Sequence, residues 1–70
     1  MKEYDSVTVL GDLADEVERI KKKYMRDRNK AHAYGYANVE AFNEGGMEAC
    51  NDILWTIKGW THDLEEARKE

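Results

Sequence analysis

The sequence predicts an all-α protein: a helical hairpin that dimerises into a four-helix bundle. Between about Asn38 and Ala67, apolar and small residues recur at steps of three or four, which places them on one stripe of an α-helix. This apolar stripe consists of Val39, Phe42, Gly46, Ala49, Ile53, Ile57, Trp60, Leu64 and Ala67. A similar rhythm runs from Leu10 to Tyr24. The chain has 70 residues, and short chains bury a lower fraction of their surface than long ones. Pairing two hairpins would supply the contact surface that one hairpin lacks.

The composition argues against several classes of protein. A single cysteine rules out an internal disulfide framework, and no Cys/His cluster offers a structural zinc site. The Glu-x-x-His pairs that di-metal bundles need are missing. No apolar run approaches the ~20 residues that span a bilayer, and the first five residues are not the start of a signal peptide. We therefore expect a cytoplasmic protein without metal, cofactor or membrane contact.

Candidate catalytic side chains are isolated in the sequence. His32 and His62 have no close partner that would complete a triad or a set of metal ligands. Cys50 lies on the shoulder of the apolar stripe, which predicts a small buried hydrophobe rather than a nucleophile. Because no acid–base or nucleophile pair can be named, the sequence predicts that the protein is not an enzyme.

The charged residues are segregated along the chain. Residues 1–18 hold one basic and six acidic side chains, a net charge of −5, and residues 19–30 hold seven basic and one acidic, a net charge of +6. Residues 31–57 hold four acidic and no basic side chains, a net charge of −4. The total of −4 argues against general coating of nucleic acid, and the block pattern is typical of helices that pair by charge.

Residues 1–11 are predicted to be an extended N-terminal segment, because Val7 and Val9 alternate with Ser6 and Thr8. Either a tail laid over the helices or a strand that pairs with a second chain fits this pattern.

Residues 12–30 are predicted to form the first helix. Asp12 and Asp15 resemble a helix entry, where carboxylates accept from free backbone N–H groups. The apolar stripe continues through Leu13, Val17, Ile20 and Tyr24. The opposite face carries a basic strip made of Arg19, Lys22, Lys23, Arg26 and Lys30. This basic strip is either an ordinary solvated helix face or an anion-binding surface.

Residues 31–37 are predicted to connect the helices, since Gly35 lowers helix propensity there. Tyr34 and Tyr36 either cap the end of the hairpin or, with the basic strip, stack against a nucleotide. Residues 38–69 are predicted to form the second helix, with Asn38 as N-cap. A continuous or kinked helix is favoured across Gly45–Gly46 because the stripe keeps its phase there, although that pair, or Gly59, is an alternative break.

The second helix carries the candidate partner-binding residues. An acidic ridge is formed by residues spaced four apart, namely Glu40, Glu44, Glu48 and Asp52. Like charges at this spacing repel, so the ridge favours a cationic neighbour. Trp55 falls on the side away from the apolar stripe, with His62 nearby. Large aromatic residues that cannot reach their own core are enriched at interface centres.

The run from Phe42 to Ile57, FNEGGMEACNDILWTI, resembles the final helix of small accessory proteins of bacteriophages and mobile elements. This resemblance covers about a quarter of the chain. It implies a protein that binds and blocks a component of a host or of a rival element, as small phage anti-defence proteins do.

Two functions therefore follow as hypotheses. The first is a non-enzymatic protein-interaction module, of the phage-inhibitor type, that binds a protein partner through Trp55, His62 and the acidic ridge. The alternative is a nucleotide or nucleic-acid binder that uses the basic strip with Tyr34 and Tyr36.

Overall fold

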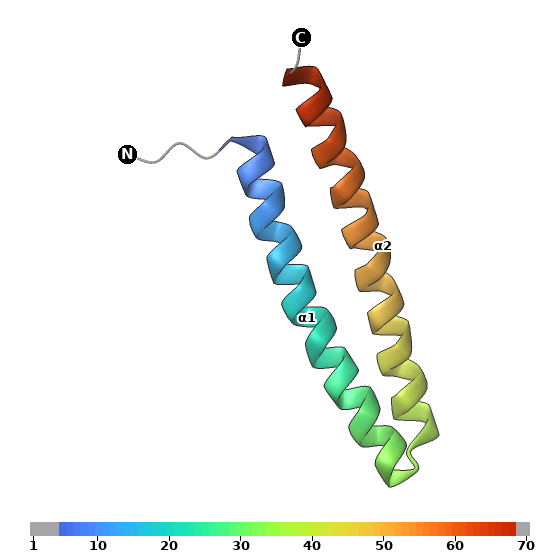
Figure 1. Ribbon diagram of the computed structural model, residues 1–70. Helices are drawn as coiled ribbons and strands as arrows, with labels where there is room; N and C mark the ends of the chain where they lie inside the picture. The colour runs from blue at the N-terminus through green and yellow to red at the C-terminus, as the bar shows by residue number, and fades with distance from the viewer. Residues whose placement is uncertain (1–4, 69–70) are drawn as a thin grey trace.

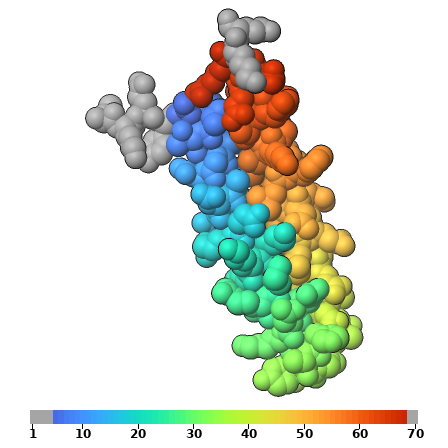
Figure 2. All heavy atoms as spheres, viewed as in Figure 1, coloured from blue at the N-terminus to red at the C-terminus, as the bar shows by residue number. Residues whose placement is uncertain are grey.

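The computed structural model describes residues 5–68, which form two antiparallel helices lying side by side (Figure 1). Helix α1 spans Ser6–Tyr34 and helix α2 spans Ala37–Arg68. The part of the chain that the structure describes contains no strand. The molecule is a slab of 54 × 26 × 11 Å, one helix thick, in which the two helices pack along their length (Figure 2). The predicted all-α hairpin is confirmed.

Helix α1 begins at Ser6, earlier than predicted. Asp5 is its N-cap, because the Thr8 N–H donates to Asp5 Oδ1 over 2.8 Å. The prediction of an extended segment over residues 1–11, with helix entry at Asp12, is wrong for residues 6–11, and residues 1–4 lie outside the described residues. The physical reason is that Leu10 packs against the core shared with α2 and Val7 is half-buried, and this burial outweighs the weak helix propensity of valine.

Asp5 also joins the open ends of the two helices, since Arg68 of α2 donates to its carboxylate. These hydrogen bonds, first from the Thr8 backbone and then from Arg68, lower the pKa of Asp5 from 3.8 to about 2. A carboxyl group whose pKa is lower in the folded state stabilises the fold above its unfolded pKa. This contribution is lost as the pH falls from near 4 through about 2.

We expect Asp5→Ala to lower the free energy of unfolding at pH 5, and we expect the difference from the wild type to shrink as the pH falls from 4 to 2. The reason is that the wild-type carboxylate becomes protonated in this window and loses its bonds to Thr8 and Arg68. Urea unfolding followed by circular dichroism at several pH values measures both proteins. A difference that stays constant between pH 5 and pH 2 would contradict the role given to the Asp5 charge.

The connection is a two-residue turn, shorter than the predicted segment 31–37. Gly35 has φ 75°, a left-handed conformation that glycine adopts without a Cβ penalty. The Gly35 N–H donates to His32 O over 3.2 Å, and the Tyr36 N–H donates to Ala31 O over 2.9 Å. This pattern is that of a Schellman motif, and it lets α1 continue to Tyr34 rather than end near residue 30.

The entry to α2 also differs from the prediction. The Glu40 N–H donates to Tyr36 O over 2.9 Å, so Tyr36, and not Asn38, occupies the N-cap position. The reason is the shortness of the turn, which leaves no room for a separate capping residue before α2. The predicted end at residue 69 lies outside the described residues.

The helices meet along a seam whose residues alternate strictly in steps of three and four. The seam of α1 consists of Val7, Leu10, Ala14, Val17, Lys21, Tyr24, Arg28 and Ala31, all buried or half-buried. The seam of α2 consists of Glu40, Asn43, Met47, Cys50, Leu54, Ile57, Thr61 and Leu64, again all buried or half-buried. A seven-residue repeat of this kind is that of a coiled coil. Its centre is a core of Val17, Cys50 and Ile57, and the predicted burial of Cys50 is confirmed.

Helix α2 is continuous through both glycine positions that offered a break. Gly46 faces α1 so closely that a Cβ atom there would lie 2.6 Å from the ring of Tyr24, whereas one at Gly45 or Gly59 would meet nothing within 4 Å. The favoured prediction of an unbroken helix is therefore confirmed. Gly46 is the position where the ring of Tyr24 in α1 approaches the backbone of α2.

The predicted apolar stripe of α2 coincides with the observed seam only at Ile57 and Leu64, and its other residues lie beside the seam. Of the nine stripe residues, only Gly46, Ile57 and Leu64 are buried or half-buried. Likewise Leu13 and Ile20 of the predicted stripe in α1 are exposed. The correction has a physical reason: the seam mixes small and polar residues with apolar ones, so its hydrophobic periodicity is weaker than that of the face beside it.

Candidate interaction surface

One long face of the hairpin is apolar and open to solvent. We call it the apolar face, and its large exposed members are Val9, Leu13, Ile20 and Tyr34 of α1 with Val39, Phe42, Ile53 and Trp60 of α2. Except for Tyr34, each lies one position before or two positions after one of the seam residues Val7, Ala14, Lys21, Glu40, Leu54 and Thr61. Tyr34 continues the seven-residue spacing of Leu13 and Ile20. In an antiparallel coiled coil these positions of the two helices flank the same side of the seam. The face therefore runs beside the seam from the open end of the hairpin to the turn.

The two halves of the apolar face come together in register. Contacts across the seam join Asp5 to Arg68 and Arg28 to Glu44, so residues equally far from the turn lie at the same level. Ile20 is therefore level with Ile53 at the middle of the face. By the same relation Leu13 is level with Trp60, and Tyr34 with Val39.

A groove lies at each end of the apolar face. The open-end groove, about 520 Å³ in volume, is lined by Asp5, Ser6, Val9, Leu10, Trp60, Asp63 and Leu64. The turn-end groove, about 500 Å³, is lined by Asp27, Lys30, Ala31, Tyr34, Tyr36, Val39, Phe42 and Asn43. Both grooves hold large exposed apolar side chains. In the turn-end groove Phe42 is 71% exposed, and its ring stands edge-on to that of Tyr24, with 6.4 Å between the ring centroids. The face thus offers hollows that apolar side chains of a partner would fill.

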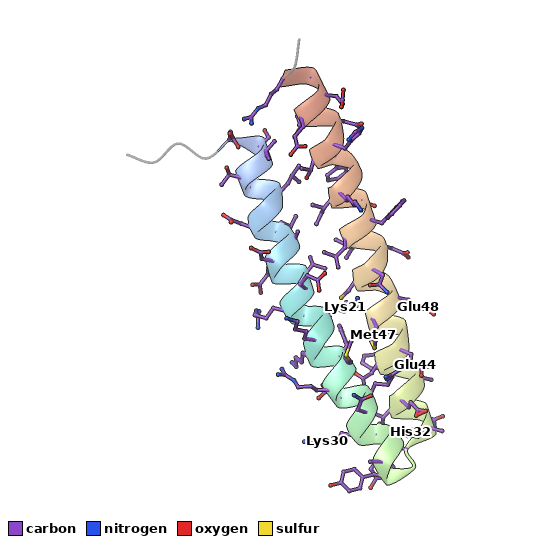
Figure 3. The ribbon with its side chains drawn as sticks, in the orientation of Figure 1. Lys21, Lys30, His32, Glu44, Met47 and Glu48 are labelled. Atoms are coloured by element: carbon purple, nitrogen blue, oxygen red, sulfur yellow. The ribbon has the colours of Figure 1, made fainter. Side chains whose placement is uncertain are left out.

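Near the turn, the opposite side of the seam is polar. His32 Nδ1 lies 2.7 Å from Glu40 Oε2, and Arg28 lies 3.9 Å from Glu44. Figure 3 shows His32 and Glu44 near the turn on this side. Near the turn the two sides of the hairpin therefore differ in chemistry: polar pairs bridge the helices on one side, and exposed apolar side chains line the other.

The predicted acidic ridge is divided between two surfaces. Glu40 and Glu44 lie against α1 and pair with His32 and Arg28. Glu48 and Asp52 are exposed, and Figure 3 shows Glu48 pointing away from α1. The division arises because residues four apart drift by about 40° at each step around a helix. Only the second half of the ridge is free to meet a partner on the outside of α2.

Trp55 lies on the outer surface of α2, as predicted. Its side chain is 76% exposed, and Lys58 Nζ lies 5.8 Å from its ring centroid, within the range of a cation–π contact. Glu48, Trp55 and His62 are spaced by seven residues and are all exposed, so they form one row on this surface. The structure thus places three of the predicted partner-binding residues on one exposed side of α2.

All five residues of the basic strip are exposed on α1. Arg19 donates to the carboxylate of Glu16, and this pairing lowers the pKa of Glu16 and raises the pKa of Arg19. Lys30 lines the turn-end groove together with Tyr34 and Tyr36, whose ring centroids are 6.1 Å apart. The remaining four residues of the strip do not line this groove, so the structure joins the tyrosines to one end of the strip.

Phe42, Ile53 and Trp60 belong to the predicted apolar stripe, and the structure places them on the exposed apolar face. The seam of α2 runs through Glu40, Asn43 and Thr61 as well as apolar residues, so its seven-residue repeat does not stand out in the sequence from that of the neighbouring face.

Between residues 5 and 68, no group of three or more His, Cys, Asp or Glu side chains is arranged to hold a metal ion. Within the same range, neither helix is both long and apolar enough to cross a membrane. Comparisons of the chain with protein families, with curated proteins and with solved structures found no match. The surfaces themselves are therefore the basis for a functional proposal.

Proposed function

We propose that the protein is a non-enzymatic protein-interaction module that acts in the cytoplasm as a homodimer. Two hairpins stack through their apolar faces and form a four-helix bundle. The observation that supports this proposal is the apolar face itself, which carries eight large exposed side chains over the length of a 70-residue chain. Exposed apolar surfaces of this extent mark interaction sites.

The packing of the single hairpin supports the same conclusion. No large side chain among the described residues is fully buried, and the core of Val17, Cys50 and Ile57 is thin. A layer one helix thick has an apolar stripe to bury and only one neighbour to bury it against, and a second layer supplies the missing neighbour. In the bundle, the seam and the apolar face would form one continuous core.

The decisive variant is Ile53→Asp, measured by light scattering over a range of concentrations. Ile53 is 47% exposed and lies at the middle of the apolar face. An aspartate there would be an unpaired charge buried between the two hairpins, which is strongly unfavourable. We expect the wild type to have twice the 8.2 kDa chain mass, and the variant's dissociation constant to rise by at least ~100-fold.

Trp55→Asp is the matched control, because it also replaces a large exposed apolar side chain of α2 with a carboxylate. Trp55 lies outside the apolar face, so this variant should keep the dimer mass. A wild-type protein that stays at the mass of one chain at all concentrations would refute the homodimer.

The outer surface of the bundle remains available for a protein partner. Trp55, His62 and Glu48 form its exposed row, with Asp52 beside them. Aromatic residues at such positions often supply a large share of binding energy. Together with the resemblance to phage accessory proteins, this row supports a protein that binds and blocks a host or rival component.

A second candidate function is binding of a nucleotide or single-stranded nucleic acid at the turn-end groove. The observation that favours it is the joining of Lys30, Tyr34 and Tyr36 in one hollow, since stacking beside a cationic group suits a base and its phosphate. The carboxylate of Asp27 in the same groove opposes it. Binding of a labelled oligonucleotide that weakens steeply with added salt would mark this function. Because the groove belongs to the apolar face, the oligonucleotide would also compete with dimerisation.

A further inference from the structure

We infer that the second copy lies antiparallel on the apolar face, so that the open end of each hairpin covers the turn end of the other. This inference rests on the proposed homodimer and adds its orientation. The partner surface is then the same face of an identical chain, related by a twofold axis that passes near Ile20 and Ile53.

The distribution of charge along the hairpin favours this orientation. The open half, residues 5–18 and 53–68, holds eight acidic and two basic side chains, a net charge of −6. The turn half, residues 19–52, holds seven basic and five acidic side chains, a net charge of +2. Antiparallel stacking places each acidic half against the basic half of the other copy. Stacking with both turns at the same end would bring two strongly acidic halves together, which like charges disfavour.

The edge of the apolar face carries the same pattern at the level of single residues. Val9, Glu16, Lys23 and Lys30 are spaced by seven and so form one edge row on α1. Val9 lines the open-end groove and Lys30 lines the turn-end groove, so this row borders the face along its length. All four side chains are exposed.

Antiparallel stacking about Ile20 gives the charged members of the edge row opposite partners. Glu16 of one copy comes level with Lys23 of the other, and the twofold axis repeats this pairing. Val9 comes level with Lys30, so that the stem of the lysine covers the open-end groove. In the same-direction arrangement, α1 instead lies beside α2 of the other copy. Glu16 then comes level with Thr56 of that copy, which is uncharged.

The grooves at the two ends of the face also match in this arrangement. The charged side chains that line the open-end groove are acidic, Asp5 and Asp63, and the turn-end groove contributes Lys30 beside Asp27. In the antiparallel dimer, the open-end groove of each chain faces the turn-end groove of the other. In the same-direction dimer, each groove faces the same groove of the other chain. Two acidic grooves would then meet.

Distances between spin labels test the orientation in the full chain. Cys50 is replaced by alanine, and a single cysteine is introduced by Thr8→Cys in one protein and by Lys22→Cys in another. Both positions are exposed and are spaced by fourteen residues, so they occupy the same side of α1. Thr8 lies twelve residues from the proposed axis, and Lys22 lies two residues from it. Because the axis doubles each offset and a helix rises 1.5 Å per residue, the two Thr8 labels should be separated by about 36 Å along the bundle and the two Lys22 labels by about 6 Å.

We expect the distance between Thr8 labels to exceed the distance between Lys22 labels by at least about 15 Å. Equal distances at both positions would overturn the antiparallel orientation while leaving the homodimer intact. A light-scattering mass of one chain would instead refute the homodimer itself, so the two failures are distinguishable.

A second measurement uses the wild-type sequence, in case the Cys50→Ala background fails to fold. Carbodiimide joins a carboxylate directly to a neighbouring lysine, and a mixture of ¹⁴N and ¹⁵N chains identifies links between copies by mass spectrometry. The antiparallel dimer should give a Glu16–Lys23 link between copies. Links between copies that exclude this pair would contradict the orientation.

Discussion

Gly46→Ala should destabilise the protein, although alanine favours a helix over glycine by about 1 kcal/mol. The added Cβ atom would lie 2.6 Å from Cδ1 and Cε1 of Tyr24 and 2.8 Å from its Cγ, too close for carbon atoms in contact. Cγ is next to the root of the side chain, so rotating the ring does not relieve the clash. The ring must move away from α2, which separates the helices at the seam.

We expect a net loss of about 1–3 kcal/mol in the free energy of unfolding, the range typical of an overpacked core. Urea unfolding followed at 222 nm measures it. The edge-on contact between Tyr24 and Phe42, 6.4 Å between ring centroids, is lost as well if the ring moves, and near-ultraviolet circular dichroism would report that change.

Gly45→Ala is the matched control, because it makes the same substitution one residue away in the same helix. A Cβ atom at Gly45 meets nothing within 4 Å, so only the helix propensity changes and the variant should gain about 0.5–1 kcal/mol. Opposite signs for the two variants would establish the close approach at Gly46. Equal stabilisation by both would show that the ring of Tyr24 does not rest on this glycine.

The class of fold follows from the sequence, but the face that packs does not. The apolar stripe through Phe42, Ile53 and Trp60 has the higher hydropathy, and helical periodicity identifies it readily. The seam of α2 instead contains Glu40, Asn43 and Thr61. Asn43 is only 4% exposed, and its side-chain Nδ2 donates to Val39 O over 2.9 Å, which gives this buried nitrogen a partner inside its own helix. Hydropathy alone cannot recognise a polar residue that is satisfied in this way.

The start of α1 shows a similar limit. Val7 and Val9 alternate with polar residues, a strand-like pattern over a stretch too short to distinguish from a helix. What decides the conformation is the packing of Leu10 against a core that includes Cys50 and Ile57 of α2, together with the hydrogen bond from Arg68 to Asp5, 63 residues apart in the chain. Tertiary packing of this kind outweighs local propensity, and a window of local sequence does not contain it.

The candidate surface was accessible to sequence reasoning only in part. The exposure of Trp55 follows from its helical phase, because it lies on the far side from both the stripe and the seam. The division of the acidic ridge does not follow in the same way, since it requires knowing that Glu40 belongs to the seam. The pairs His32–Glu40 and Arg28–Glu44 depend on the level at which the two helices align, which the two-residue turn determines.

Ile57→Ala should cause the largest loss of stability in the chain. Ile57 is 4% exposed and belongs to the core with Val17 and Cys50, so its truncation removes buried apolar atoms and leaves a cavity. Such substitutions cost about 2–5 kcal/mol, while native domains are stable by about 0.05–0.15 kcal/mol per residue. For 70 residues this loss is a large part of the total, and thermal unfolding should show a substantially lower midpoint.

Trp55→Ala is the control for Ile57→Ala. It removes more apolar atoms than Ile57→Ala, but from a side chain that is 76% exposed, so we expect a change within about 0.5 kcal/mol. The same contrast should hold in the dimer, because Trp55 lies outside the apolar face. A large loss of helicity in Trp55→Ala would place this tryptophan in the core of the bundle, and the apolar face could not then be the surface that the second copy covers.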